Sequence, residues 1–151
     1  MSPRSGAPLA LVLIALAVTG CGGSELSKQD KTFYDNVNTQ CSQLLQKVTG
    51  AADTNTPNAP HDDILAQAQR ALANASRQVL GMSAPASQRA AQRDLAAALD
   101  SSSGAIGRYL QDKQTNEAAT SGDYNTIVAD LSALQQTAST SHAKACAIPV
   151  E

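Results

Sequence analysis

Apolar residues recur at alternating intervals of three and four along the chain, which is the spacing of one face of an α-helix. The first such stretch extends from about Lys28 to Thr49, and its apolar stripe consists of Tyr34, Val37, Cys41, Leu44 and Val48. The second extends from about Asp62 to Leu80, with a stripe of Leu65, Ala68, Leu72, Ala75, Val79 and Met82. We expect Gly50 to end the first helix and the two aspartates, Asp62 and Asp63, to stabilise the start of the second through the helix dipole.

Two more helices are predicted in the second half of the chain. After a turn over residues 81–85, Ser83 is expected to cap the third helix and Pro85 to lie in its first turn. This helix runs to about Lys113, and its apolar stripe is Leu95, Leu99, Ile106 and Tyr109. Its Ser-Ser-Ser-Gly segment at 101–104 indicates either close helix contact or a kink. The fourth helix follows residues 121–123 and keeps its spacing, up to the break at Pro149, through Tyr124, Ile127, Leu131, Leu134, Ala138, Ser141 and Ala145.

No segment alternates apolar and polar residues as a β-strand would, and aromatic residues make up only 3% of the chain. The core must therefore consist of leucine, isoleucine, valine and alanine, and an alanine-rich sequence with few runs of β-branched residues favours helices. The sequence predicts an all-α domain, a four-helix bundle, whose longest connection is the polar loop 51–60.

The first 21 residues show the order of an export signal. Arg4 precedes an unbroken apolar run from Leu9 to Val18, and Val18-Thr19-Gly20-Cys21 follows at once. Ten apolar residues suit a signal-peptide core, whereas a membrane-spanning helix needs about 20. This order resembles the lipobox of bacterial lipoproteins, in which a peptidase cuts before a cysteine that carries a diacylglyceryl group. The resemblance implies a cleaved signal peptide at 1–20, a lipidated tether at 21–27 and the helical domain at 28–151.

Lipidation of Cys21 would hold the domain on the outer side of a bacterial cell membrane, and the membrane is therefore its first expected partner. Each buried methylene contributes about 0.8 kcal/mol, so one acyl chain anchors a protein marginally and two anchor it stably. Alanine is abundant and arginine outnumbers lysine in the middle of the chain, a composition typical of a high-GC bacterium, and the resemblance would then be to a small alanine-rich lipoprotein of such an organism.

Cys41 and Cys146 remain after Cys21 is assigned to the lipid. In an oxidising compartment two cysteines are expected to pair, although two buried free thiols are the alternative. Their pairing conflicts with a simple up-down-up-down bundle, because Cys146 would then lie on the order of 20 Å from Cys41. Either the chain leaves the fourth helix early and folds back, or the first and fourth helices run parallel. The sequence leaves both arrangements open.

The charge is unremarkable as a whole but uneven along the chain. A net charge of −2 gives no nucleic-acid signature. From Ile64 to Arg93, however, no acidic residue occurs, and the segment contains four arginines, Arg70, Arg77, Arg89 and Arg93. A hairpin about Ser83 would bring Arg77 and Arg89 together as a basic patch that could meet anionic lipid or an acidic protein partner. A solvated helix face is the plainer interpretation.

The sequence contains few groups that could perform catalysis. His61 and His142 are the only histidines, and the chain has no Gly-x-Ser-x-Gly, His-Glu-x-x-His, Cys-x-x-Cys or phosphate-binding motif. The sequence therefore assigns no catalytic residue, no metal ligand and no cofactor. One of the tyrosines, Tyr34, Tyr109 or Tyr124, could ligate haem together with His142 or Met82, but each is also explained as a residue at the edge of the core.

These observations favour a non-enzymatic binding or interaction module that is anchored to a membrane. The alternative is a carrier that holds an apolar ligand, lipid or haem, between its helices. A large apolar pocket would favour the carrier, and a packed bundle with a distinctive exposed surface would favour the module.

Overall fold

The computed structural model describes residues 25–53, 61–115 and 120–148. These ranges form four α-helices, α1 (Lys28–Asp53), α2 (His61–Gly81), α3 (Arg89–Thr115) and α4 (Thr120–Thr140). Two short 3-10 helices, η1 (Ala86–Gln88) and η3 (Lys144–Cys146), precede α3 and follow α4. The part of the chain described contains no strand, and the predicted all-α bundle is confirmed.

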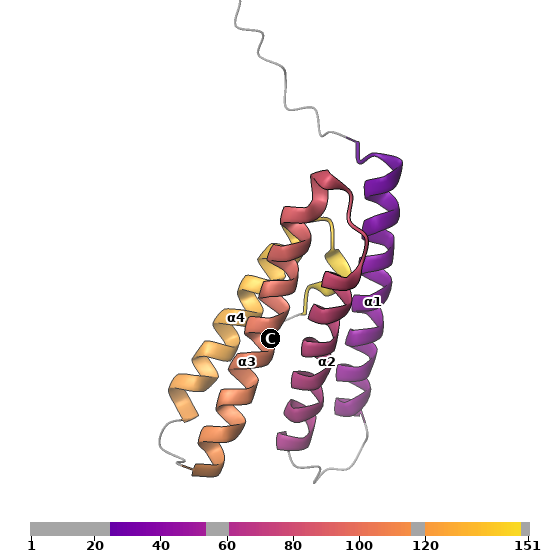
Figure 1. Cartoon of the computed structure of the whole chain (residues 1–151). Coiled ribbons are helices and arrows are strands. Elements are labelled where there is room, and N and C mark those ends of the chain that lie inside the picture. The colour runs from indigo at the N-terminus through magenta and orange to yellow at the C-terminus, as the bar shows by residue number, and fades with distance from the viewer. Residues whose placement is uncertain (1–24, 54–60, 116–119, 149–151) are drawn as a thin grey trace, which may run out of the picture.

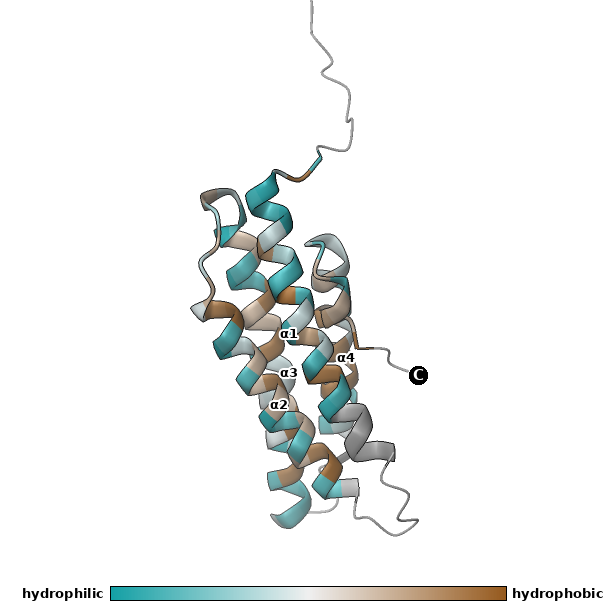
Figure 2. Cartoon of the chain, turned by 90° about the vertical axis from the view of Figure 1, so that its right-hand side faces the viewer, coloured by the Kyte–Doolittle hydropathy of each residue, from teal (hydrophilic) through white to brown (hydrophobic). Residues whose placement is uncertain are grey.

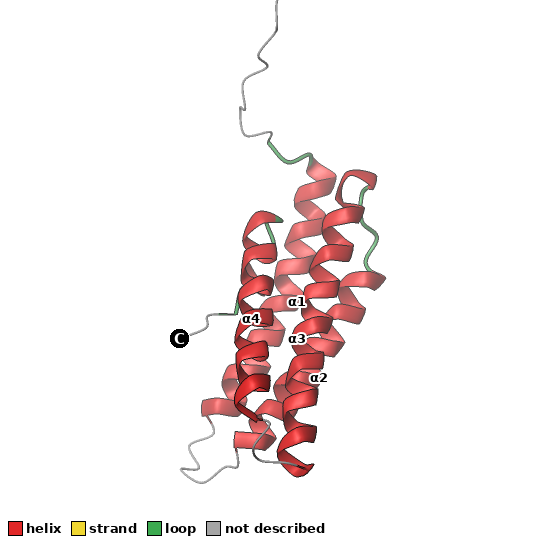
Figure 3. Cartoon of the chain, turned by 90° about the vertical axis from the view of Figure 1, so that its left-hand side faces the viewer, coloured by secondary structure: helices red, strands yellow, loops and turns green. Residues whose placement is uncertain are grey.

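Consecutive helices run in opposite directions, so α1 and α4 are antiparallel (Figure 1). The backbone of α2 lies against both α1 and α3, and α3 lies against α4. The remaining side of the bundle, between α1 and α4, is filled by η3, which contacts both helices. The entry to α1, the α2–α3 connection and the turn after α4 all lie at one end of the bundle (Figure 3). We call this the entry end.

All four helices contribute to the core. The largest side chains that are almost fully buried are aliphatic: Val37, Leu72, Val79, Leu95, Leu99 and Leu134. Burying one such side chain contributes about 1.5–3 kcal/mol relative to leaving it exposed. Each helix carries both hydrophobic and hydrophilic residues (Figure 2), as expected for helices with one buried face. The predicted stripes of the first three helices are thus largely confirmed, whereas Tyr124 of the fourth is 58% exposed.

The α2–α3 pair is held by hydrogen bonds between side chains and backbone. The Ser76 hydroxyl donates to the Ala96 carbonyl at 2.8 Å, and the Ser103 hydroxyl donates to the Gln69 carbonyl at 3.0 Å. A Cβ atom on Gly107 would lie 2.6 Å from Nε2 of Gln69, so the two helices approach closely there. Of the two possibilities for the small-residue segment at 101–104, the structure shows close helix contact.

A buried disulfide fixes the chain after α4. Cys41 of α1 and Cys146 of η3 are bonded, their Cα atoms are 4.8 Å apart, and both residues are 0% exposed. The helix ends at Thr140, and His142 takes a positive φ of 62° that turns the chain back along the bundle. The amide of Asn38 holds the returning segment, since its Nδ2 donates to the His142 carbonyl and its Oδ1 accepts from the Ala145 amide. The chain therefore leaves the fourth helix early, and the parallel arrangement is wrong.

Three predicted helix ends differ from the structure. α1 continues past Gly50 to Asp53, because a single glycine costs a helix only about 1 kcal/mol and two alanines follow it. Ser83 does not cap the third helix. Pro85 takes the cap position of η1 instead, with φ −54° and ψ 152° and no side-chain cap, so it precedes the first helical turn rather than lying in it. The fourth helix stops at Thr140 rather than near Pro149, which lies outside the described residues.

Among the described residues, no helix has the length and apolar character needed to cross a bilayer. The apolar run from Leu9 to Val18 and the predicted lipidation site Cys21 lie outside the described residues. They remain predictions from the sequence.

Candidate functional site

The most distinctive surface lies on the seam between α2 and α3, close to the entry end. Arg77 of α2 and Arg93 of α3 line one groove of about 330 Å³ together with Leu80. Leu80 is 54% exposed, an unusual exposure for a leucine in a domain whose other large aliphatic side chains are mostly covered. Apolar and cationic groups are thus combined in a single shallow depression.

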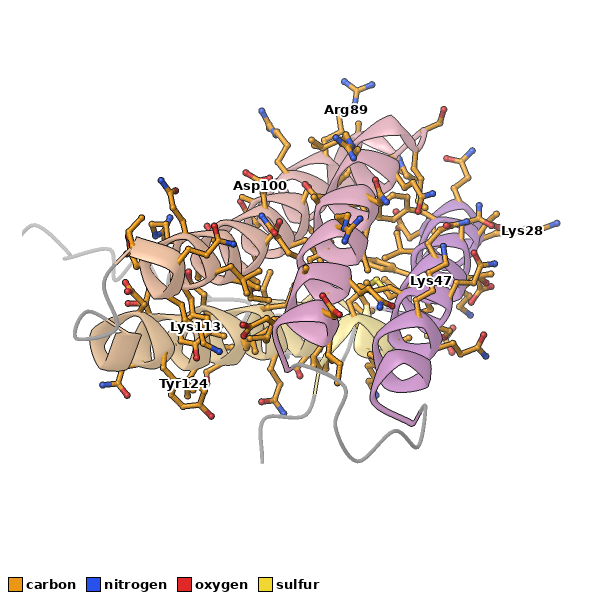
Figure 4. The ribbon with its side chains drawn as sticks, turned by 90° about the horizontal axis from the view of Figure 1, so that it is seen from below. Lys28, Lys47, Arg89, Asp100, Lys113 and Tyr124 are labelled. Carbon is orange, nitrogen blue, oxygen red and sulfur yellow. A yellow bond between two sulfur atoms is a disulfide. The ribbon has the colours of Figure 1, made fainter. Side chains whose placement is uncertain are left out.

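Arg89 extends this surface toward the end of the bundle. It begins α3, and it lies one helical turn before Arg93, whose Nε donates to the Arg89 carbonyl at 3.2 Å. Figure 4 shows Arg89 pointing away from the bundle. We call the four residues Arg77, Leu80, Arg89 and Arg93 the α2–α3 basic surface.

The structure divides the basic patch that the sequence predicted. It is Arg93, rather than Arg89, that shares a groove with Arg77. Arg70 lies apart, in a groove of about 500 Å³ between α1 and α2, where Lys47 is the second cation. The register of the α2–α3 hairpin decides this pairing, and the sequence did not supply that register.

The guanidinium groups of this region are not neutralised by neighbouring carboxylates. In the ranges that the structure describes, neither Arg77 nor Arg93 forms an ion pair. Arg77 donates to Oδ1 of Asn74 at 2.5 Å, which orients the side chain without cancelling its charge. The acidic residue in the groove is Asp100, which lies about two helical turns beyond Arg93. The positive charge is therefore available to a partner.

A second, more polar groove of about 360 Å³ opens at the entry end. Its lining includes Tyr34, Gln88, Asp94 and His142. The Tyr34 hydroxyl donates to Oε1 of Gln88 at 2.6 Å, and the Tyr34 ring lies 5.6 Å from the His142 ring, centroid to centroid. Burial, and secondarily the charge of Asp30, raises the pKa of the Tyr34 phenol. The tyrosine therefore stays protonated and hydrogen-bonded, which suits a structural contact.

Of the residues considered as haem ligands, the structure brings Tyr34 and His142 together, with their rings 5.6 Å apart. Tyr34 lies near the start of α1, at the entry end, whereas Tyr124 is exposed in the first turns of α4, at the other end of the bundle. In the described ranges, no group of three histidine, cysteine or acidic residues is arranged to hold a metal ion. The Tyr34 hydroxyl is already engaged by Gln88, so the proximity of Tyr34 and His142 does not by itself favour the haem carrier.

Sequence reasoning missed a buried carboxylate at the entry end. Asp30 is only 8% exposed, and the hydroxyls of Ser27 and Ser87 donate to its two oxygens at 2.7 and 2.9 Å. The Asp30 amide donates in turn to the Ser27 hydroxyl at 3.1 Å, which completes a capping box at the start of α1. These hydrogen bonds, that from Ser27 first, lower the pKa of Asp30. The spacing Ser-x-x-Asp directly before the apolar stripe was the signal that could have identified it.

Sequence reasoning also missed a pair of carboxylates, Asp112 and Asp123, at the opposite end of the bundle. Burial, followed by the charge of Asp112, raises the pKa of Asp123, and Arg108 opposes this effect. Oδ2 of Asp123 is buried and accepts no hydrogen bond from any described residue. Two carboxylates from α3 and α4 therefore approach each other with incomplete compensation, and one proton shared between them would relieve the repulsion.

These features define a disulfide-closed helical bundle with an exposed surface of arginine and leucine beside its entry end. The chain matches no protein-family model, no curated protein and no solved structure.

Proposed function

We propose that this protein is a lipid-anchored lipoprotein of the outer face of a bacterial cell membrane, and that its helical domain is a non-enzymatic binding or interaction module. The main support for a binding or interaction module is the α2–α3 basic surface, on which arginines without an ion pair surround an exposed leucine. Exposed apolar area bordered by unneutralised charge is typical of surfaces that meet another molecule.

Two further observations support the location. The Cys41–Cys146 disulfide is fully buried in the core, and structural disulfides form and persist in oxidising compartments outside the cytoplasm. The sequence Val18-Thr19-Gly20-Cys21 resembles a lipobox and follows a run of apolar residues of signal-peptide length. The oxidising compartment that the disulfide favours is thus the one to which a lipoprotein signal would direct the chain.

The module is preferred to the carrier of an apolar ligand. The centre of the bundle is occupied by aliphatic side chains such as Leu72, Leu99 and Leu134, which are at most 1% exposed. The largest groove described above lies on the surface between α1 and α2 and is lined by Lys47, Arg70 and amide side chains. A lipid or haem between the helices would instead need a deep apolar pocket.

The anchor is tested by changing Cys21→Ala in the full chain, expressed in a bacterium that processes lipoproteins. We expect the variant to lose both metabolic labelling by a fatty acid and partitioning into detergent, because the acyl chains provide the membrane affinity. The matched control is the Cys41→Ala/Cys146→Ala double variant, which removes two other cysteines and should keep the label. Label that persists in Cys21→Ala would contradict the proposed anchor.

The choice between module and carrier is tested by native mass spectrometry of the protein purified from membranes, with absorbance recorded in the haem region. We expect a mass equal to the acylated chain alone. An additional stoichiometric lipid or haem would contradict the module and establish the carrier.

A further inference from the structure

Leu80 occupies a position that commits it to the surface. It lies in the last turn of α2, next to the fully buried Val79, so its side chain leaves the helix on a different side from the core. The Gln92 side chain holds this turn, since its Nε2 donates to the carbonyls of Val79 and Met82 at 2.6 and 2.7 Å. The exposed leucine therefore projects from a fixed backbone.

Cations lie on both sides of this leucine. Arg77 is three residues earlier on α2, and Arg93 faces it from α3 across the same groove. Arg89 adds a third charge one turn from Arg93, toward the entry end. The nearby acids are Asp94, which lines the groove around Tyr34, and Asp100. An apolar side chain flanked by guanidinium groups is the arrangement by which surface helices enter the interface of an anionic bilayer.

The same surface lies beside the point at which the chain enters the domain. In the α2–α3 connection, the Ser87 hydroxyl donates to Asp30, and the Gln88 side chain accepts from the Tyr34 hydroxyl. These two hydrogen bonds link the connection to the first two turns of α1. Cys21 is four residues before Glu25, the first described residue. Four residues reach at most about 14 Å. If the proposed anchor on Cys21 holds, the α2–α3 basic surface is kept close to the headgroups.

We propose that the α2–α3 basic surface docks on the anionic lipid of the membrane that carries the anchor, with Leu80 inserted into the interface and Arg77, Arg89 and Arg93 on lipid phosphates. This inference rests on the proposed lipidation and adds an orientation to it. Each arginine near an anionic surface raises the ratio of docked to undocked protein about fivefold. Because the anchor has already brought the domain to the membrane, the contributions of a few arginines are enough to determine which face meets the lipid.

The chain contains no tryptophan, and this allows a direct test. Leu80→Trp and Tyr124→Trp each introduce a single fluorophore at an exposed hydrophobic position, one within the proposed surface and one at the opposite end of the bundle. The acylated proteins are reconstituted into phosphatidylcholine vesicles with or without phosphatidylglycerol, and quenching by brominated acyl chains is measured. We expect quenching and a blue shift for Leu80→Trp in anionic vesicles only, reversed by high salt. Tyr124→Trp should remain unquenched.

The charges are tested in the Leu80→Trp background. Changing Arg77→Gln and Arg93→Gln together should lower the ratio of docked to undocked protein about 30-fold at low salt. The matched control changes Lys47→Gln and Arg70→Gln, which removes two charges from the α1–α2 groove and should leave quenching unchanged. Circular dichroism of all variants establishes that helicity is preserved.

The possible results separate this inference from the proposed anchor. Acylated protein that associates with vesicles but shows equal, weak quenching at Leu80→Trp and Tyr124→Trp overturns the docking surface and leaves the anchor intact. An intact mass without acyl chains overturns both. A blue shift in native membranes that is absent from protein-free anionic vesicles also overturns lipid docking, because residue 80 then meets a membrane component other than anionic lipid.

Discussion

Asp30 joins two parts of the chain through a single carboxylate. It caps the first turn of α1 through Ser27, and it binds Ser87 of η1, which is 57 residues away in the sequence. Hydrogen bonds to an ionised carboxylate are roughly twice as strong as neutral ones. The ionised form of this residue therefore connects the start of α1 to the connection between α2 and α3.

Changing Asp30→Asn should lower the melting temperature at pH 7. Because hydrogen bonds lower the pKa of Asp30 in the folded state, the folded state binds the proton less tightly than the unfolded chain. The stabilisation is therefore present above the ordinary pKa of 3.8 and is lost as the pH falls through the lowered value. Thermal unfolding followed by circular dichroism should show a difference between variant and wild type that shrinks in acid. Asp35→Asn, an exposed change on the same helix, is the control; a pH-independent difference for Asp30→Asn would contradict the account.

Asp123 should behave in the opposite sense. Its pKa is raised, so the folded state binds the proton more tightly than the unfolded chain, and this group destabilises the fold as the pH rises above the ordinary value of 3.8. Asp123→Asn should therefore raise the melting temperature at pH 7, with a gain that disappears as the pH is lowered toward that value. Asp112→Asn should shift it in the same direction, since it removes the other charge. A lower melting temperature for both variants at pH 7 would refute the proposed repulsion.

At the scale of elements, the bundle is closed by a returning segment rather than by a fourth helix pair. η3 lies between α1 and α4. Its position depends on Cys146 and on the side-chain amide of Asn38, which accepts from the Ala145 amide and donates to the His142 carbonyl. The loop that the disulfide closes spans a sequence separation of 105 residues. On the chain-entropy model, a loop of this length is worth about 4.7 kcal/mol.

Replacing both Cys41 and Cys146 by alanine should therefore lower the free energy of unfolding by up to about 4.7 kcal/mol. Urea denaturation of the double variant, beside the oxidised wild type, measures this loss. Hydrogen exchange should in addition show faster exchange in residues 141–148 than in the α2–α3 pair, because η3 loses its covalent link. An unchanged urea midpoint would mean that packing alone holds the segment.

Periodicity predicted the helices well because their apolar faces are wide and regular. It failed where competing contacts decide the outcome. The spacing of Ser141 and Ala145 continues the helical pattern of α4, yet the disulfide and Asn38 draw that segment back toward α1. The absence of acidic residues between Ile64 and Arg93 pointed to Arg77, Arg89 and Arg93, but equally to Arg70, which lies in another groove. The exposure of Leu80 and the pairing of Arg77 with Arg93 required the register between two helices, which no local pattern contains.

At the scale of the whole molecule, the two ends of the bundle differ in character. The entry end carries the described loops, the Asp30 network and the α2–α3 basic surface (Figure 3). The opposite end carries the pair Asp112 and Asp123 and the ion pair of Lys113 with Asp62 at 2.6 Å. The proposed docking on anionic lipid requires such a difference between the ends, and the proposed anchor precedes the entry end in the sequence.

The Cys41–Cys146 bond also determines how the chain carries a mechanical load. Traced along covalent bonds, the shortest route from Cys21 to Glu151 follows the first half of α1, crosses the disulfide and leaves after η3. Tension between the two ends would therefore bypass α2, α3 and α4. Within the described residues, pulling could unravel α1 only from Lys28 to Cys41, a gain of at most about 30 Å, before the disulfide stops the extension. The α2–α3 seam would keep its shape under a force that stretches the start of the chain.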